Sequence, residues 1–231
     1  NPRVCQERAK RMVSLKPNGF QITLPDWWPP TFNESKNFIL GMQEVVEDIY
    51  MILYNPPHAK VLLSLEEISL LKQSVQNLVG IKCAGGDEQW YSQRRELLDD
   101  FSVFVPGHTV VYGKPLGANG SYSNVACLSP NGAVKIWDLI EKDYEKAQEL
   151  EAKVLNFMKQ YILPFANKLS NTGLDKLLAS VGGWGPVSEK VLWPYDGATA
   201  EDVKKIKIHA NNELEEIPVS YTHLRAHETQ D

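Results

Sequence analysis

The sequence predicts an α/β protein with a parallel β-sheet, followed by a region of helices alone. Four short, nearly continuous apolar runs occur at residues 20–24, 49–54, 78–82 and 101–105, with polar, helix-patterned segments between them. Such runs are typical of parallel strands covered on both faces. A fifth candidate strand, 120–125, follows a glycine-rich stretch. Alternating strands and helices give either an open doubly wound sheet or a closed barrel, and the pattern alone leaves both open.

Helix signals stand between these runs. Ser64 and Glu67 form a capping box, in which each side chain satisfies a backbone N–H of the other residue, and they predict a helix to about Ser74. A second helix is predicted after Asn33, because the apolar residues that follow are spaced by three and four positions.

From about residue 129 the pattern is helical only. An apolar stripe over 147–161 is stopped by Pro164, and a helix over 175–181 ends at Gly182 and Gly183, which suits a left-handed terminus. A separate helical domain is the alternative, but no flexible linker precedes it. Residues 219–231 have no apolar period and resemble translated read-through of a sequencing adapter, so they are not expected to contribute to the fold.

Composition excludes several classes of protein. The 231 residues are 43% hydrophobic and 23% charged, which suits one globular core. The net charge of −5 argues against nucleic acid as a partner. No apolar run approaches the ~18 residues of a membrane-spanning helix. Three cysteines without metal-type spacing predict reduced thiols and a cytoplasmic protein.

Lys82 is the most informative position. It ends the run 78–82, so a buried strand would deliver its ammonium to the carboxyl-terminal edge of the sheet. Burial favours the neutral amine, which is the form that attacks a carbonyl carbon to make an iminium. The plain alternative is a lysine that reaches solvent from a strand end.

Tyr54 also ends an apolar run. If the two strands are consecutive in the sheet, its ring stands next to Lys82 on the same face. Formation and dehydration of a carbinolamine need proton transfer, which a positioned phenol supplies. An ordinary strand-end tyrosine is the alternative.

Three motifs together resemble one known family. They are Tyr54-Asn-Pro-Pro57, then Val79-Gly-Ile-Lys82 with Gly85-Gly-Asp87, and Gly117-Ala-Asn-Gly-Ser-Tyr-Ser123. The chain is similar in these motifs to the dihydrodipicolinate synthase and N-acetylneuraminate lyase family of class I aldolases, over residues 19–194. The resemblance implies a (β/α)8 TIM barrel with extra carboxyl-terminal helices, usually a homotetramer. It also implies that Lys82 forms the Schiff base with pyruvate and that Tyr54 moves protons.

The family's early Gly-Thr-Thr-Gly-type loop, which holds the pyruvate carboxylate, does not occur in this sequence, and the sequence does not begin with Met. We therefore expect barrel strands 4–8 to be present and the first three βα units to be missing. The expected organisation is a partial barrel over 1–128, then the last barrel helix and carboxyl-terminal helices over 129–218. Such a fragment should expose strand edges and be inactive.

Two departures concern the substrate pocket. Pro25-Asp-Trp-Trp28 stands where many relatives have paired tyrosines, and an indole cannot continue a phenolic proton relay. We expect Trp28 to line the pocket, with hydrophobic packing as the alternative. Where the lysine-pathway enzymes have an arginine, this chain has His58 and Lys60. Lys60 supplies a point charge without arginine's two-pronged geometry, which argues against aspartate semialdehyde as second substrate.

Three further residues are candidate substrate contacts. His108 follows the run 101–105, although a satisfied loop histidine is the alternative and no second metal ligand is suitably spaced. Gly120 and Ser121 could allow close backbone approach to a substrate. A phosphate site there is a weaker interpretation, because the spacing matches no phosphate-binding fingerprint.

The expected function is that of a lyase. Lys82 condenses with a 2-oxo acid, and the enamine adds to, or leaves from, an aldehyde. No cofactor is expected, because the protonated imine itself is the electron sink. The alternatives are dehydration of a sugar acid through the same iminium, and a noncatalytic homologue that binds a 2-oxo acid.

Overall fold

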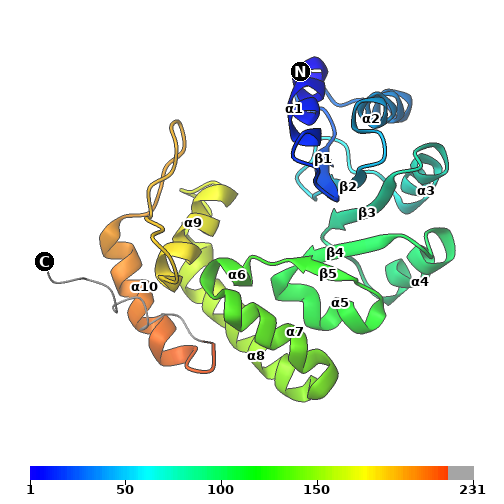
Figure 1. The fold of residues 1–231 in the computed structure, drawn as a ribbon. Helices are drawn as coiled ribbons and strands as arrows, with labels where there is room; N and C mark the ends of the chain where they lie inside the picture. The colour runs from blue at the N-terminus through cyan, green and yellow to red at the C-terminus, as the bar shows by residue number, and fades with distance from the viewer. Residues whose placement is uncertain (218–231) are drawn as a thin grey trace, which may run out of the picture. The chain divides into compact units, whose positions relative to one another are not determined.

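A computed structural model describes residues 1–217, and their contacts divide into two compact units. The first unit consists of Asn1–Val105 and Gly113–Tyr122. The second consists of Pro106–Tyr112 and the described residues from Ser123 onward. Figure 1 shows the β-sheet in the first unit and helices following it in the chain. The segment interpreted as adapter read-through, 219–231, lies outside the described residues.

One five-stranded sheet forms the centre of the first unit, and its strands lie side by side in chain order. Doubly wound sheets reverse their order at a switch point, so this order favours barrel-type winding. The strands are β1 (Gly19–Thr23), β2 (Tyr50–Asn55), β3 (Leu78–Cys83), β4 (Ser102–Pro106) and β5 (Gly120–Tyr122). The first four confirm the predicted strands to within a residue or so.

The fifth strand is shorter than predicted. It ends at Tyr122, and helix α6 (Val125–Leu128) begins where the prediction still had strand. The apolar residues Val125 and Leu128 are both buried, so the apolar character that suggested a longer strand serves a helix instead. Short apolar segments cannot be assigned to strand or helix by periodicity alone.

Side chains alternate in direction along each strand, and the two faces of the sheet differ in burial. Ile22, Leu53, Ile81 and Val103 are register partners across β1–β4, and all four are buried. The residue after each of them points to the opposite face, and those four residues are half-buried or exposed. The helices therefore cover the first face, while the second face remains accessible within this unit.

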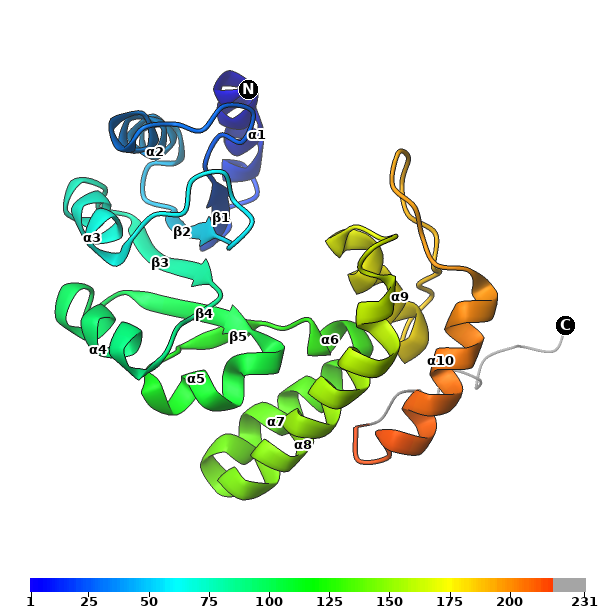
Figure 2. The ribbon, with the colours of Figure 1, turned by 180° about the vertical axis from the view of Figure 1, so that it is seen from behind.

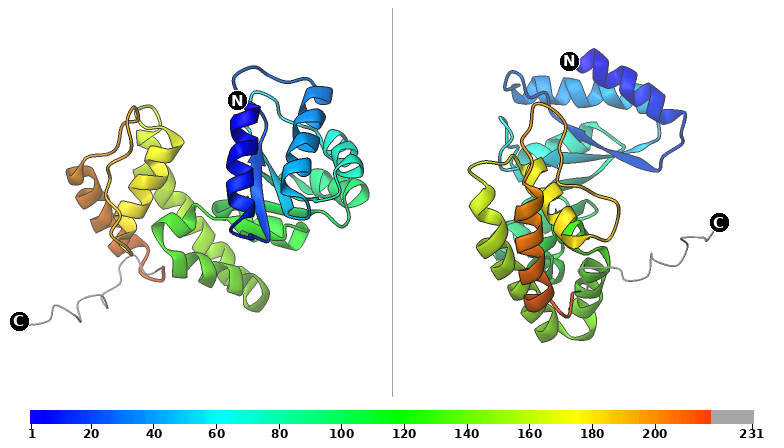
Figure 3. Two further views of the ribbon diagram at one scale, coloured as in Figure 1. Left: turned by 45° about the horizontal axis from the view of Figure 1, so that its top comes forward. Right: turned by 90° about the vertical axis from the view of Figure 1, so that its left-hand side faces the viewer.

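Helices follow the strands on the covered face, as Figure 2 shows. The predicted capping box of Ser64 and Glu67 is confirmed, since each side chain bonds the other residue's backbone N–H. The predicted start of the preceding helix at Asn33 is wrong, because Thr31 is the cap and pairs with Glu34. The helices are α1 (Pro2–Val13), α2 (Phe32–Val46), α3 (Leu65–Ser74) and α4 (Glu88–Leu97). Helix α5 (Val110–Leu116) has its first three residues in the second unit and the rest in the first. Figure 3 shows α1 and α2 side by side.

The second unit is helical, as predicted. The stripe over 147–161 forms α8 (Tyr144–Phe157), but the α-helix changes to a π-helical turn at Met158 before Pro164 is reached. Helix α9 (Asn171–Gly182) ends at Gly183, whose φ of 59° confirms the left-handed terminus. The other main helices of this unit are α7 (Pro130–Lys142) and α10 (Ala200–Glu213). Among residues 1–217, no helix has the length and apolar content needed to cross a membrane.

Candidate active site

Four side chains share one row across the accessible face of the sheet. Thr23, Tyr54, Lys82 and Phe104 are register partners on β1 to β4. Partners in adjacent parallel strands point to the same face, so the row brings these side chains together. The Lys82 Nζ atom lies 4.2 Å from the centre of the Tyr54 ring. The predicted proximity of Lys82 and Tyr54 is confirmed.

A second phenol stands at the same lysine. The Lys82 Nζ atom is 4.8 Å from the centre of the Tyr122 ring, which comes from β5. Tyr122 belongs to the motif 117–123 but is not among the site residues predicted from the sequence. The available signal was alternation, because Tyr122 lies two positions after Gly120 and so shares its face of the strand.

The residue after Lys82 faces the other way. Cys83 is the register partner of Asn55, and both line a pocket of about 400 Å³ on the helix-covered side of the sheet. Burial raises the pKa of the Cys83 thiol. A protonated thiol is a poor nucleophile, so this environment does not activate Cys83.

A pocket of about 250 Å³ adjoins Tyr54. Its wall includes His58, whose ring meets the Tyr54 ring edge-on with 6.3 Å between centres. Lys60 also lines it, and its Nζ donates a hydrogen bond to the Trp27 carbonyl oxygen at 3.1 Å. The structure thus brings the predicted binding residue Lys60 to the same pocket as the predicted proton carrier Tyr54.

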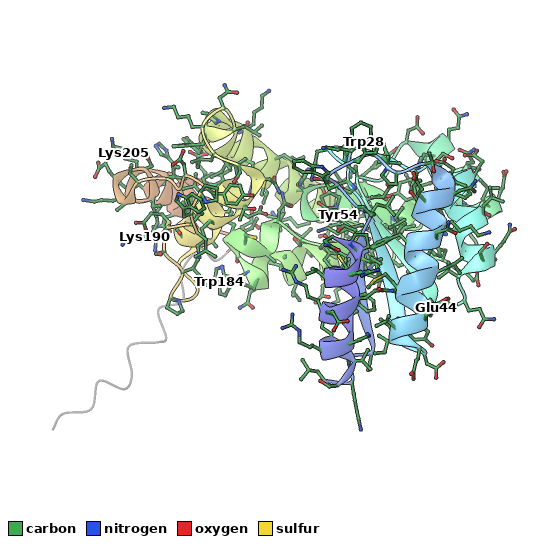
Figure 4. The ribbon with its side chains drawn as sticks, turned by 90° about the horizontal axis from the view of Figure 1, so that it is seen from above. Trp28, Glu44, Tyr54, Trp184, Lys190 and Lys205 are labelled. Atoms are coloured by element: carbon green, nitrogen blue, oxygen red, sulfur yellow. The ribbon has the colours of Figure 1, made fainter. Side chains whose placement is uncertain are left out.

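Trp28 is not part of this pocket wall, and 77% of its surface is exposed. Figure 4 labels Trp28 and Tyr54 toward one end of the first unit and Glu44, near the end of α2, toward the other. Trp28 therefore lies toward the same end of the first unit as Tyr54. In this structure it contributes an exposed indole rather than a wall of the pocket.

Asn55 orders the loop that carries His58 and Lys60. Its buried side chain donates to the Leu63 carbonyl at 2.9 Å and accepts from the Leu63 N–H at 3.1 Å. Two hydrogen bonds across eight residues fix both ends of the loop. The Tyr-Asn pair of the sequence motif therefore combines a site residue with the residue that holds the neighbouring loop.

Gly120 and Ser121 differ in their surroundings. A Cβ atom on Gly120 would lie 2.9 Å from the Phe104 ring, so close packing of β5 on β4 requires glycine here. The Ser121 hydroxyl is buried without a hydrogen-bond partner among the described residues, on the side of β5 away from Tyr122. The substrate contact predicted for Gly120 and Ser121 would therefore be made by their backbone atoms.

His108 belongs to the second unit, where its Nδ1 atom lies 3.1 Å from the Asn124 Oδ1 atom. Its predicted role in substrate binding stays a prediction. Within residues 1–217, no group of three or more His, Cys, Asp and Glu side chains is arranged to hold a metal ion.

Comparison with known proteins identifies the family. The model of the dihydrodipicolinate synthetase family matches residues 9–207. A 4-hydroxy-tetrahydrodipicolinate synthase of Teredinibacter turnerae is 33% identical over 106 residues, a stretch that spans 45% of this chain and 36% of that protein. The chain thus matches about a third of the length of this relative.

Two solved structures share the fold. YagE of E. coli K12, a prophage protein of the dihydrodipicolinic acid synthase family in complex with pyruvate, has a TM-score of 0.77 and 20% identity, covering 93% of this chain and 72% of its own. N-acetylneuraminate lyase of Fusobacterium nucleatum has a TM-score of 0.76 and 18% identity, covering 92% and 71%. The five parallel strands thus resemble those of a TIM barrel of this family, and the chain belongs to the dihydrodipicolinate synthetase family.

Proposed function

We propose that the protein is a class I lyase in which Lys82 forms a Schiff base with a 2-oxo acid, and that the 2-oxo acid is pyruvate. The observation that carries the proposal is the pairing of Lys82 and Tyr54 on adjacent strands, with Nζ 4.2 Å from the phenol ring. Family membership supports it, and so does the pyruvate bound in the similar structure of YagE.

The first step forms one bond and breaks another. The neutral Lys82 amine adds to the ketone carbon, and the resulting carbinolamine loses its oxygen as water to leave a cationic iminium. Tyr54 moves one proton from the nitrogen to the oxygen to give the carbinolamine, and a second proton, taken up from solvent through Tyr54, lets that oxygen leave as water. The iminium then accepts the electron pair that a proton or an aldehyde leaves on the neighbouring carbon, and an enamine results.

The second substrate binds, in this proposal, in the 250 Å³ pocket beside Tyr54. Lys60 offers one cationic group there, and His58 offers a polar ring edge. A single ammonium attracts an acid group without the two parallel hydrogen bonds of a guanidinium. We therefore propose that the second substrate is an aldehyde or sugar acid whose anionic group need not be held in one orientation, rather than aspartate semialdehyde.

Proton exchange at pyruvate tests the proposal without knowledge of the second substrate. Enamine formation releases a methyl proton of pyruvate, so the full-length protein in deuterated water should replace methyl protons by deuterium, as measured by NMR. Lys82→Arg should abolish the exchange, whereas Lys10→Arg, on exposed helix α1, should retain it. Equal exchange in the Lys82→Arg variant would overturn the proposal.

A panel of aldehydes and sugar acids, assayed by consumption or release of pyruvate, then separates the remaining possibilities. Aldehyde-dependent consumption of pyruvate supports aldol chemistry. Loss of water from a sugar acid without carbon–carbon cleavage would instead assign dehydration through the same iminium, and would rule out aldol chemistry. Exchange without turnover of any candidate would favour a homologue that only binds 2-oxo acids.

A further inference from the structure

Tyr122 gives Lys82 a second aromatic neighbour. In strand order, Tyr54 on β2 precedes Lys82 on β3, and Tyr122 on β5 follows it beyond β4. The two ring centres lie 4.2 and 4.8 Å from the Lys82 Nζ atom. Both distances are within the ~6 Å over which a ring face attracts a cation. The Lys82 nitrogen therefore has an aromatic ring on each flanking side of its strand.

The Tyr122 ring is held in place by its neighbours on β4. Phe104, the register partner of Lys82, meets Tyr122 edge-to-face with 5.5 Å between ring centres and an interplanar angle of 80°. The missing side chain of Gly120 lets β5 lie against the Phe104 ring. Phe104 thus links the lysine's row of side chains to the strand that carries Tyr122.

The entry to β5 is also fixed. The Asn119 N–H donates to the Val103 carbonyl at 2.8 Å, and the Asn119 Oδ1 atom accepts from the Val103 N–H at 2.9 Å. The buried Arg94 guanidinium donates to the same Oδ1 atom at 3.1 Å. Three hydrogen bonds to the residue three positions before Tyr122 anchor its strand on β4.

We propose that the ring of Tyr122 stabilises positive charge on the Lys82 nitrogen, both in the resting ammonium and in the iminium. The face of an aromatic ring carries partial negative charge, which favours a cation over a neutral amine or carbinolamine. The iminium part of this inference rests on the proposed function. The ammonium part stands on the geometry alone.

The alternative role for Tyr122 is proton transfer by its hydroxyl. The two roles depend on different parts of the side chain, so two substitutions separate them. Tyr122→Phe keeps the ring and removes the hydroxyl. Tyr122→Leu removes the ring as well. Tyr122 is 41% exposed, so neither change opens a core cavity, and circular dichroism checks that each variant folds.

Trace acetylation by acetic anhydride measures the charged fraction of Lys82 without any substrate. Only the neutral amine reacts, so the ratio of the Lys82 rate at about pH 7 to that at about pH 10 reports the charge and cancels accessibility. Rates are read by peptide mass mapping, with exposed Lys10 as internal reference. Tyr112→Leu is the matched control, because Tyr112 is 45% exposed and belongs to the second unit.

The proposal predicts that Tyr122→Leu raises this ratio about three- to tenfold, whereas Tyr122→Phe and Tyr112→Leu leave it within about 1.5-fold of the unmodified chain. An unchanged ratio in Tyr122→Leu would overturn the proposal. An equal rise in Tyr122→Phe would also overturn it and assign the effect to the hydroxyl.

Borohydride reduction with pyruvate provides the second readout. Because the ring would stabilise the ammonium and the iminium alike, the readout is the pH dependence of trapping. The yield of reduced adduct on Lys82 should fall at a lower pH in Tyr122→Leu than in the unmodified chain, and at an unchanged pH in Tyr122→Phe. An unchanged pH profile in Tyr122→Leu contradicts iminium stabilisation. If the unmodified chain forms no adduct, the proposed function and the iminium part both fail, while the acetylation ratio still decides the ammonium part.

Discussion

Tyr54 and Lys82 are register partners on adjacent parallel strands, and the lysine nitrogen lies 4.2 Å from the centre of the tyrosine ring. The pairing follows from the sheet itself, because β2 and β3 are neighbours and both side chains point to the accessible face. Neither residue depends on a long loop for its position. A lysine and a phenol fixed in this way form the core of the proposed Schiff-base site.

Tyr54→Phe should slow deuterium exchange into pyruvate by about a hundredfold or more, because general acid–base catalysis typically contributes that much. The ring remains in place beside Lys82, so the folded structure should be unchanged. Tyr50→Phe is the matched control, since Tyr50 lies at the opposite end of the same strand. An exchange rate in Tyr54→Phe equal to that of the control would remove Tyr54 from the proton path.

Asn55→Ala should lower the free energy of unfolding by about 2 kcal/mol, because it leaves the Leu63 N–H and C=O without their partners in a buried place. Urea denaturation measures the change. Asn37→Ala on the exposed side of α2 should stay within about 0.5 kcal/mol of the unmodified chain. Equal stabilities of the two variants would mean that this pair of hydrogen bonds does not hold the loop.

Gly120→Ala should destabilise the first unit by about 1–3 kcal/mol, since the added methyl group meets the Phe104 ring at 2.9 Å. The displaced ring should also disturb Tyr122 and reduce trapping of pyruvate. Gly185→Ala is the comparison, because an added Cβ there finds its nearest neighbour at 4.0 Å. Unaltered stability and trapping in Gly120→Ala would show that β5 moves away from β4 freely.

Glu151→Gln should stabilise the second unit at neutral pH. Burial raises the pKa of Glu151 above its ordinary value of 4.5, against the opposing effect of the Val111 N–H bond. An acid with a raised folded pKa favours folding in its protonated form, so stability is lost as the pH rises from about 4.5 through the folded pKa. Glu151→Gln has no carboxyl to ionise, so it should not lose stability in this pH range, and its side-chain oxygen can still accept the hydrogen bond from the Val111 N–H.

Thermal unfolding followed by circular dichroism measures this effect. The melting temperature of Glu151→Gln should exceed that of the unmodified chain by about 2 °C at pH 7, and the two should converge as the pH falls toward about 4. A lower melting temperature in Glu151→Gln at pH 7 would reverse the sign and contradict the account of this carboxyl.

The strands and the central pair of residues could be predicted because their signals are local. Apolar runs mark β1–β4, and a polar residue at the end of each of two runs marks Tyr54 and Lys82. The N-cap of α2 was harder to predict. Asn33 and Thr31 are both residue types that cap helices well, and only the capping-box partner Glu34 favours Thr31. Helix α1 was not predicted, since it precedes the first strand and buries little apolar surface beyond Ala9.

Alternation places Tyr122 on the same face as Gly120, but its contact with Lys82 could not be predicted from the sequence because that contact depends on non-local geometry. Its approach to Lys82 requires that β5 pair with β4 at one register, and that Gly120 bring the strand against Phe104. A three-residue strand gives too weak a pattern to fix that register. The exposure of Trp28 and the burial of the Ser121 hydroxyl are likewise consequences of loop and strand packing.

The most direct test of the central claim is the location of the covalent bond to pyruvate. The full-length protein should be reduced with borohydride in the presence of pyruvate, digested, and its peptides mapped by mass spectrometry. The Schiff-base account predicts a reduced pyruvate adduct on Lys82, lost in Lys82→Arg and retained in Lys10→Arg. An adduct on another lysine, or none on Lys82, would contradict it.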